Sequence, residues 1–288
     1  MIGGVDVWWR GADGVCLYGA DYAPVGEEAG LPVICLHGFT RNSRDFEAVA
    51  PWIAARGRRV VAMDMRGRGR SDHDRESSRY TPLVYAFDVL GLMASLGIPR
   101  AVFVGTSMGG LITLVIASVK PDAVAAAVLN DVGPEVSPEG LARILRYAGA
   151  PAAVATWAEA ADYARSVSPG GVLDDAQAAR LARRLFREDA SGAPLRDYDP
   201  AIMAPVSAMP AQAAAPDLWP AFLALAAGRP LLAVRGEDSD ILRIATLRRM
   251  AAEASDLTSV EVPGVGHAPT LEEPVVLSAL AAFLDRAP

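Results

Sequence analysis

Residues 102–112 read Val-Phe-Val-Gly-Thr-Ser-Met-Gly-Gly-Leu-Ile, a Gly-x-Ser-x-Gly motif between a strand-like apolar run and a helix-like one. Ser107 stands at the turn, and Gly105 and Gly109 lie two residues to either side. A serine at a tight strand-to-helix turn needs strained backbone angles, and larger flanking side chains would collide there. A glycine-rich phosphate loop is the alternative, but the motif lacks the Gly-Lys-Ser/Thr ending of a P-loop. The motif therefore predicts a projecting, nucleophilic Ser107.

Short apolar runs alternate with helix-length segments on both sides of this motif. This alternation predicts an α/β fold, with an eight-stranded, mostly parallel sheet and helices on both faces. The link at residues 11–14 is rich in turn residues, so the first two strands should form an antiparallel hairpin. The predicted strands span residues 5–10, 15–22, 32–36, 59–63, 101–105, 123–130, 230–235 and 258–263.

The alternation stops for about a hundred residues after the sixth strand, which indicates an insertion. Residues 134–210 are predicted to form a helical cap, and residues 1–133 together with 211–288 the core domain. The large side chains of this cap either line a substrate pocket or form the cap's own core. Of these side chains, Trp157 is assigned to substrate binding. The large side chains are Tyr147, Trp157, Tyr163, Phe186, Tyr198, Met203 and Met209. The predicted cap helices cover residues 140–147, 152–167 and 174–188.

A nucleophilic serine needs a general base, most often histidine, and the chain has three. His37 directly follows a predicted strand, and His73 lies in a polar run typical of a solvated loop. His267 comes just after the last predicted strand and is flanked by small residues. We therefore expect His267 to be the base that reaches Ser107.

The acid that orients this histidine is expected between Ser107 and His267 in the sequence. Asp240 is our choice, because it follows a strand and precedes the apolar pair that re-enters the fold. Asp238, read as a solvent-facing turn residue, is a second candidate. Asp131, at the end of the preceding strand, is a third, with a hydrogen-bonded residue at the cap hinge as its alternative interpretation.

An oxyanion hole needs two fixed backbone amides, and those of Phe39 and Met108 are the predicted donors. Residues of the same first loop, His37, Gly38 and Arg41, are assigned to substrate binding. Arg41 can bind a substrate carboxylate through two parallel hydrogen bonds, or it can form an ion pair that holds the loop.

With these motifs in order, the chain resembles the α/β-hydrolase fold superfamily over nearly its whole length. The stretches 37–39, 64–71 and 105–109 resemble the family's oxyanion loop, its D-x-R-G-x-G-x-S loop and its nucleophile elbow. His267 lies in a Gly-His-x-Pro pattern similar to the family's terminal motif. The resemblance implies a catalytic Ser107, Asp240 and His267 and no metal or cofactor. Ser239 departs from the pattern, since many members carry the acid at that position.

Composition excludes other classes of protein. The chain has 288 residues and a formal charge of −7, and it lacks the basic block that follows a nucleic-acid backbone. No apolar run approaches the length of a membrane span, and two cysteines cannot form a secreted disulfide framework. We expect a bacterial-type cytoplasmic enzyme, a monomer or homodimer, that acts on a small molecule without nucleic-acid or membrane partners.

Three functions are weighed. The first is hydrolysis of a carboxylic ester of a small acyl or aromatic substrate through an acyl-enzyme, as in small bacterial carboxylesterases. The second keeps the same triad for lactone opening or for carbon-carbon cleavage of aromatic ring-fission products. The third is a non-catalytic ligand-binding protein on this scaffold.

Overall fold

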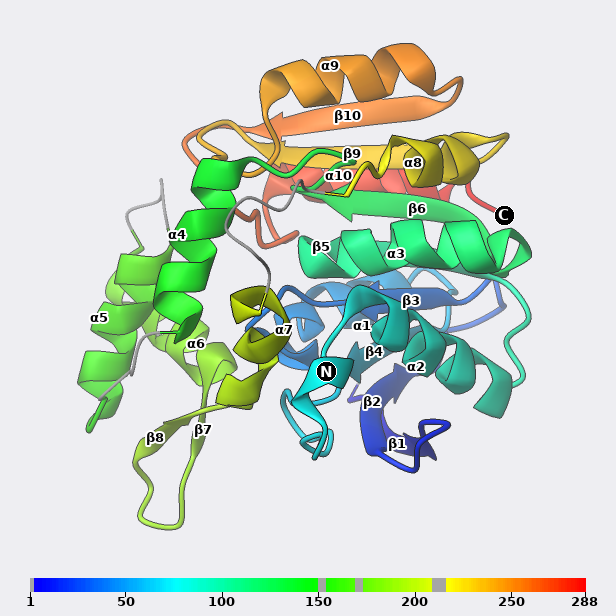
Figure 1. The fold of residues 1–288 in the computed structure, drawn as a ribbon. Coiled ribbons are helices and arrows are strands. Elements are labelled where there is room, and N and C mark those ends of the chain that lie inside the picture. Colours follow the sequence, from blue (N-terminus) through cyan, green and yellow to red (C-terminus); the bar gives the residue numbers. More distant parts are fainter. Residues whose placement is uncertain (1–2, 150–153, 169–172, 209–215) are drawn as a thin grey trace.

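The computed structural model describes residues 3–149, 154–168, 173–208 and 216–288, and an eight-stranded sheet lies at its centre (Figure 1). Its strand order is β1-β2-β4-β3-β5-β6-β9-β10. The first strand pairs antiparallel with the second, the second pairs antiparallel with β4, and the remaining neighbours are parallel. The strands are β1 (Val5–Arg10), β2 (Cys16–Tyr22), β3 (Val33–Leu36), β4 (Val60–Asp64), β5 (Ala101–Thr106), β6 (Val124–Asn130), β9 (Leu231–Gly236) and β10 (Leu257–Val262). The predicted fold class is confirmed.

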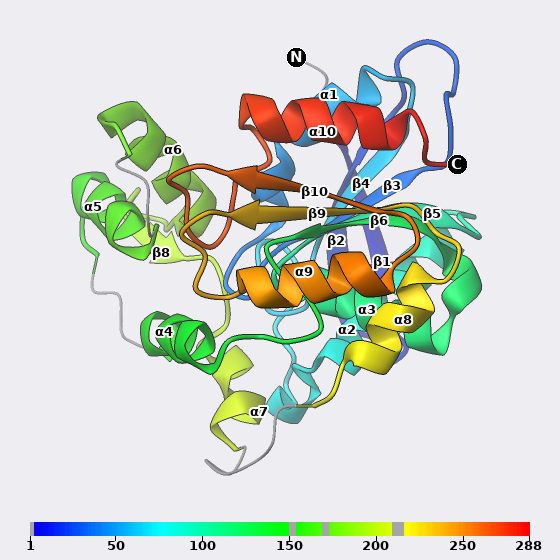
Figure 2. The same ribbon diagram turned by 90° about the horizontal axis from the view of Figure 1, so that it is seen from above.

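Alternating side chains on the central strands serve two hydrophobic cores, one on each face of the sheet. In β3, Ile34 and Leu36 pack on one face, and Val33 and Cys35 pack on the other. Burial on both faces explains why the central strands are continuously apolar rather than alternating with polar residues. Helices α2 (Pro82–Ser95), α3 (Met108–Val119), α8 (Trp219–Ala226) and α9 (Ile244–Glu253) cover the first face, and α1 (Val49–Ala54) and α10 (Pro274–Leu284) cover the second (Figure 2).

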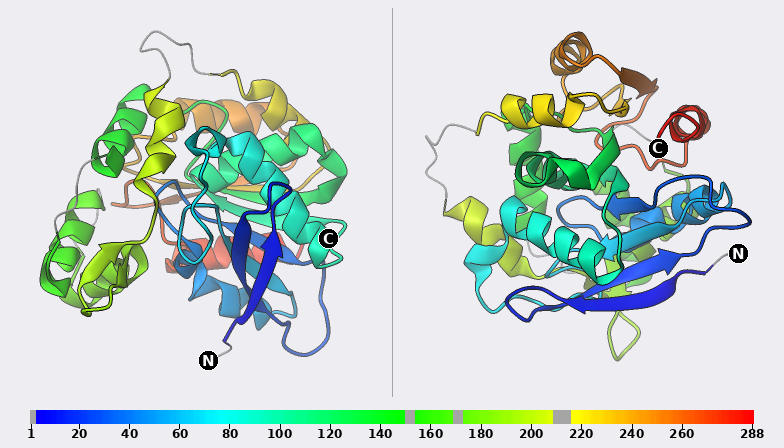
Figure 3. Two further views of the ribbon diagram at one scale, coloured as in Figure 1. Left: turned by 60° about the horizontal axis from the view of Figure 1, so that its bottom comes forward. Right: turned by 90° about the vertical axis from the view of Figure 1, so that its right-hand side faces the viewer.

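The antiparallel hairpin forms one edge of the sheet (Figure 3). Its turn closes through the amide of Gly11, which donates to the Val15 carbonyl at 2.9 Å, and Gly14 adopts a φ of 87°. A positive φ is readily reached only by glycine, so the turn-rich link does form the predicted reversal. Short 3₁₀ turns elsewhere in the core are η1 (Ser43–Phe46), η2 (Ser77–Arg79) and η3 (Pro121–Ala123).

The segment inserted between β6 and β9 lies beside the sheet (Figures 1 and 3). It contains α4 (Pro138–Gly149), α5 (Trp157–Val167), α6 (Asp175–Leu185), β7 (Phe186–Glu188), β8 (Pro194–Arg196), η4 (Pro200–Met203) and α7 (Ala204–Ser207). The segment is therefore mainly helical but not only helical. Met209 and the predicted boundary at residues 210 and 211 lie outside the described residues.

The antiparallel pair β7–β8 corrects the predicted helix over residues 174–188, which ends at Leu185. A turn stabilises the hairpin: the Asp189 carboxylate accepts the amides of Ser191 and Ala193 at 2.7 and 3.0 Å, and Gly192 has a φ of 84°. These local hydrogen bonds offer the backbone an alternative to helix, so the helix stops before them.

Charged side chains attach the inserted segment to the core. Arg184 of α6 binds Glu272 at 2.6 Å and Glu47 at 2.9 Å, both of which belong to the core. Arg44 of η1 reaches Asp197 of the inserted segment at 2.6 Å. The segment is thus held over one end of the sheet by contacts on two sides. Within the described ranges, no helix is both long and apolar enough to cross a membrane.

Candidate active site

Ser107 lies at the turn between β5 and α3, with φ 53° and ψ −114°. A positive φ is strained for a residue other than glycine, and here the surrounding backbone enforces it. A Cβ on Gly105 would lie 2.5 Å from the Gly109 carbonyl carbon, and one on Gly109 would lie 2.1 Å from the Leu36 oxygen. Both glycines are therefore required by close backbone approach, as the sequence motif predicts.

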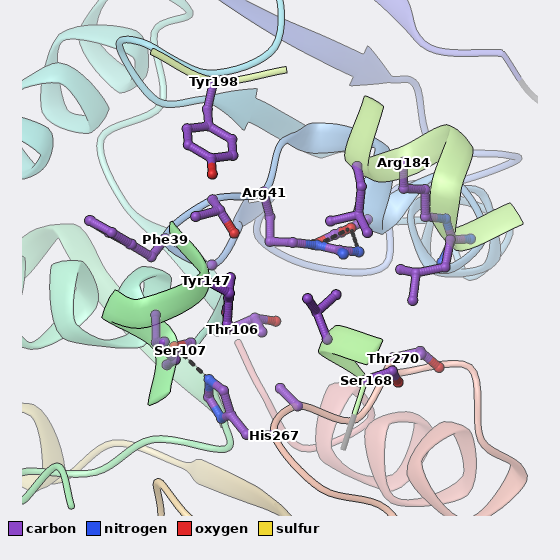
Figure 4. Close-up of a pocket in the computed structure, with 18 of the residues that line it drawn as sticks. Phe39, Arg41, Thr106, Ser107, Tyr147, Ser168, Arg184, Tyr198, His267 and Thr270 are labelled. Carbon is purple, nitrogen blue, oxygen red and sulfur yellow. Dashed lines mark hydrogen bonds and ion pairs between the residues drawn. The ribbon is translucent and has the colours of Figure 1, made fainter. Parts of the chain in front are cut away.

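His267 lies beside Ser107 on the loop that follows β10. Its Nε2 is 2.9 Å from Ser107 Oγ (Figure 4). Its Nδ1 is 2.7 Å from Asp131 Oδ2. A carboxylate only accepts hydrogen bonds, so Nδ1 carries the proton and donates to Asp131. Nε2 is then free to accept the Ser107 hydroxyl proton. The structure thus places the predicted serine and histidine within hydrogen-bond reach of each other.

Asp131 directly follows β6 and is completely buried. Its Oδ1 accepts the Gly236 amide at 3.1 Å, and its Oδ2 accepts the Ser239 hydroxyl at 2.6 Å in addition to the His267 ring. Three donors, two from the end of β9 and the loop after it and one from the loop after β10, fix this carboxylate in one orientation.

The structure corrects the expectation that Asp240 orients His267. The Asp240 carboxylate instead receives two hydrogen bonds from Arg143 of α4, with an Nη2–Oδ1 distance of 2.7 Å. Hydrogen bonding to this guanidinium holds the pKa of Asp240 below its usual value. The Ser239 hydroxyl accepts the amides of Ile241 and Leu242, which forms a turn after β9. Asp238, the second candidate, is exposed.

The loop after β3 and the start of α3 meet at Ser107. A Cβ placed on Gly38 would lie 3.8 Å from Ser107 Cβ, so this loop passes close to the serine. Among the described residues, the amides of Phe39 and Met108 donate no hydrogen bond to the protein. Two unused donors near a serine are what an oxyanion hole requires.

Arg68 contacts both predicted oxyanion-hole residues, and the sequence reasoning did not single it out. It is completely buried, and its Nε donates to the Phe39 carbonyl at 3.0 Å while Nη2 contacts Met108 Sδ at 3.8 Å. Its Nη1 donates to the Tyr85 hydroxyl at 2.8 Å. One guanidinium therefore touches both residues whose amides lie unused beside Ser107. The only signal in the sequence is its position in the 64–71 loop motif.

His37 does not reach the cavity, which corrects its assignment to substrate binding. The ring is completely buried, its Nε2 accepts the Met65 amide at 3.0 Å, and its Nδ1 donates to the Gly38 carbonyl at 2.7 Å. Burial lowers the pKa of His37 to about 4, so the ring is neutral. Its role is to attach the loop after β3 to the end of β4.

A cavity of about 130 Å³ opens above Ser107 and His267 (Figure 4). The core contributes Gly38 and Arg41 to the lining, as predicted. Arg41 also forms an ion pair with Asp45 of the same loop region, which is the alternative role that the sequence left open for it. The inserted segment contributes side chains from α4, α5, α6, β7 and β8. Those that the sequence singled out and that line the cavity are Tyr147, Tyr163, Phe186 and Tyr198.

Trp157 does not line this cavity, and its assignment to substrate binding is therefore wrong. Its indole donates to the Gly192 carbonyl at 2.9 Å, and Arg183 stacks on its ring at 3.5 Å. Trp157 thus fastens α5 to the β7–β8 turn. Met203 also lies outside the lining. Within the described part of the chain, no group of three or more His, Cys, Asp or Glu side chains is arranged to hold a metal ion.

The chain matches the family model of the alpha/beta hydrolase fold over residues 32–274, and it belongs to that family. It is 34% identical over 262 residues to the 3-hydroxybutyrate-oligomer hydrolase of Cupriavidus necator, with 88% of each chain covered. It is 29% identical to the 2-(acetamidomethylene)succinate hydrolase of Mesorhizobium japonicum, with 89% of each covered. A crystal structure of an alpha/beta hydrolase from Novosphingobium aromaticivorans superposes with a TM-score of 0.91, at 42% identity and 99% coverage of both chains.

Proposed function

We propose that the protein is a serine hydrolase that cleaves a carboxylic ester through an acyl-enzyme intermediate. The observation that carries this proposal is the continuous hydrogen-bond chain from Asp131 through His267 to Ser107, which opens into the cavity. A base within 2.9 Å of the hydroxyl, itself oriented by a buried carboxylate, is the arrangement that activates a serine.

In the first step, Ser107 Oγ attacks the ester carbonyl carbon while its proton passes to His267 Nε2. The imidazole becomes positively charged, and the Asp131 carboxylate beside Nδ1 stabilises that charge. The carbonyl oxygen gains negative charge in the tetrahedral intermediate. The amides of Phe39 and Met108 donate to it, each contributing about 3 kcal/mol.

The intermediate then collapses to the acyl-enzyme. The bond between the carbonyl carbon and the alcohol oxygen breaks, and His267 returns its proton to the departing alcohol. Water follows the same route: His267 removes its proton, the hydroxide attacks the acyl carbon, and Ser107 leaves with that proton. The products are an acid and an alcohol, and the site returns to its starting state.

Residues 134–210 act in this proposal as the cap that selects the substrate. Most of the cavity wall opposite Ser107 comes from this segment, and the tyrosines on it give that wall both apolar and polar surface. The cap and the core together line the site.

An ester is favoured over the other two chemistries that the triad supports. The relative from Cupriavidus necator is named for hydrolysis of 3-hydroxybutyrate oligomers, and units of a hydroxy acid are joined head to tail by ester bonds. Lactone opening and carbon-carbon cleavage of ring-fission products are the second candidates. A purely ligand-binding protein is disfavoured by the aligned Ser107, His267 and Asp131.

Replacement of the nucleophile tests the proposal. Ser107→Ala is expected to lower kcat toward p-nitrophenyl butyrate by about 10⁵-fold, because the covalent step is lost. A fluorophosphonate probe should label the parent and not this variant. The matched control is Ser95→Ala, which changes an exposed serine of α2 and should leave turnover and labelling intact.

Retained turnover in a folded Ser107→Ala protein would overturn the proposal. The reaction class is tested by assaying a simple ester, a lactone and a ring-fission dienoate side by side. We expect the highest kcat/KM on the ester. A large preference for the dienoate would reassign the enzyme to carbon-carbon hydrolysis, and a large preference for the lactone would reassign it to lactone opening.

A further inference from the structure

Three arginines line the described cavity, and they differ in how their charge is compensated. Arg41 is bound by Asp45, with Nε 2.8 Å from Oδ2. Arg184 is bound by two glutamates of the core. Arg196, in β8, has no carboxylate partner among the residues that the structure describes. It is the one arginine of this set whose charge is not balanced.

The guanidinium of Arg196 uses only one of its two edges. Its Nη1 donates to the Tyr198 hydroxyl at 2.6 Å and to the Ala148 carbonyl at 3.5 Å. Its Nε and Nη2 are buried and have no hydrogen-bond partner in the described structure. Buried donors that are left unpaired are costly, and charged ones more so than neutral ones. A ligand that accepts both hydrogen bonds would remove this cost.

The unused edge is the one by which other arginines of this chain bind carboxylates. Arg59 donates to Asp21 from Nε at 3.0 Å and from Nη2 at 2.6 Å. Arg143 contacts Asp240 through the same two atoms. Parallel Nε–H and Nη2–H groups match the spacing of two carboxylate oxygens, so this edge selects a planar anion.

The groups beside the Arg196 guanidinium include two neutral tyrosine rings and, among the described residues, no carboxylate that would compete with an anionic ligand. The rings of Tyr198 and Tyr163 lie 5.4 and 5.8 Å from its guanidinium carbon, and both line the cavity. Burial raises the pKa of Tyr198 to about 12 and raises that of Tyr163, so both phenols stay neutral. The Tyr198 hydroxyl points into the cavity, with Ser107 and His267 at the opposite end (Figure 4).

We propose that the Nε and Nη2 edge of Arg196 is the binding subsite for a carboxylate of the substrate. The inference rests on the proposed function and makes it narrower: the enzyme prefers esters that also carry a free carboxylate. The ester carbonyl lies at Ser107, and the carboxylate lies at the cap wall. The sequence analysis suggested Arg41 for binding a substrate carboxylate, and the proposal assigns that role to Arg196 of the cap instead.

Binding is the first test, because it does not depend on turnover. In the Ser107→Ala protein, monomethyl adipate should bind about 10- to 100-fold more tightly than its neutral amide, as measured by calorimetry. Adding Arg196→Gln should abolish that difference. Arg183→Gln is the matched control, since Arg183 is a cap arginine that stacks on Trp157 outside the cavity lining. Arg196→Lys, which keeps the charge but not the two-donor edge, should retain only part of the difference.

Turnover in the otherwise unchanged enzyme then locates the carboxylate. Monomethyl adipate carries it on the acyl side and 4-acetoxybutyrate on the alcohol side, and each is compared with its neutral amide. We expect one anionic ester to exceed its amide about 10- to 100-fold in kcat/KM, and this ratio to fall to near one in Arg196→Gln.

Equal rates for anionic and neutral esters, or a preference that survives Arg196→Gln, would overturn the inference. Those results leave the proposed function intact, provided that p-nitrophenyl butyrate is still hydrolysed through Ser107. Loss of all ester hydrolysis in the parent enzyme would instead overturn the proposed function. If a lowered melting temperature shows that Arg196→Gln does not fold, the preference for the anionic ligand is measured in Arg196→Lys instead. A preference as large as in the parent would then overturn the inference.

Discussion

The carboxyl ends of β6 and β9 each deliver an aspartate near the active site, but in different environments. Asp131, after β6, is completely buried and accepts hydrogen bonds from Gly236, Ser239 and His267. Asp240, after β9, is 36% exposed at its side chain and is bound by Arg143. The difference lies in the donors: two of the three around Asp131 come from the β9 loop itself. In the proposed triad, the loop after β9 therefore supports an acid that the neighbouring strand supplies.

The comparison teaches that position after a strand does not by itself define the orienting acid. Ser239 stands at the position where many members of the family carry the acid, whereas our prediction was Asp240; the Ser239 hydroxyl instead donates to Asp131 at 2.6 Å. Asp240, one residue later, points toward α4. Three substitutions test this difference between the two strand ends, in order of decreasing effect.

The largest effect is expected for Asp131→Asn, which should lower kcat about 10³- to 10⁴-fold with little loss of fold. The asparagine amide can donate to Nδ1 of His267, so the ring proton moves to Nε2, which then no longer accepts the Ser107 proton. The measurement is p-nitrophenyl butyrate turnover beside Asp240→Asn. A greater loss in Asp240→Asn than in Asp131→Asn would reverse the assignment.

An intermediate effect is expected for Ser239→Ala, which removes the 2.6 Å hydrogen bond to Asp131. We expect kcat to fall about 10-fold, since a hydrogen bond to a charged group contributes about 1.5–3 kcal/mol. KM should change little, because Ser239 does not line the cavity. Ser239→Thr keeps the hydroxyl and should restore most of the activity. If threonine restores nothing, Ser239 acts only through the fold of its loop.

The smallest effect on activity is expected for Asp240→Asn, at most about twofold, because Asp240 does not contact the imidazole. The variant should lose at most about 1 kcal/mol of unfolding free energy, as is usual for a half-exposed ion pair. Hydrogen bonding to Arg143 lowers the pKa of Asp240 from its ordinary value of 3.8. The ion pair therefore stabilises the fold fully at pH values above 3.8. That stability is lost as the pH falls through the lowered pKa.

Thermal unfolding of Asp240→Asn and of the parent should therefore differ most near neutral pH and converge in strong acid. A difference that grows with acidity would contradict this account of the Arg143 pair.

The fold was largely predictable because the signals that specify it are local. The eight strands lie within a residue or two of their predicted positions, since apolar runs of strand length and glycines at tight turns are visible in the sequence. The β7–β8 hairpin was missed because Phe186 continues the helical pattern of α6, and the sequence does not show that the Asp189 carboxylate accepts the amides two and four residues later.

The site was predictable only in part. Ser107 and His267 stand in motifs whose spacing reflects backbone geometry, and the structure brings them together. The identity of the acid depends on which of several loops turns inward, and no local pattern separates Asp131 from Asp240. His37 and Trp157 were misassigned for a similar reason: a residue type near a site does not reveal whether its side chain faces the cavity or the interior.

Arg68 links two parts of the active site that are far apart in sequence. Because a single guanidinium contacts the Phe39 carbonyl and the Met108 sulfur, the gap between the two loops depends on the length of one side chain. Within the described residues, no carboxylate offsets its charge, and the group is shielded from water. In such a low-dielectric interior, the electrostatic field of the Arg68 guanidinium falls off slowly with distance. In the proposed mechanism, this field adds to both amide dipoles when the carbonyl oxygen of the ester becomes negative between them. The proposed site therefore combines a buried internal cation with oriented backbone donors.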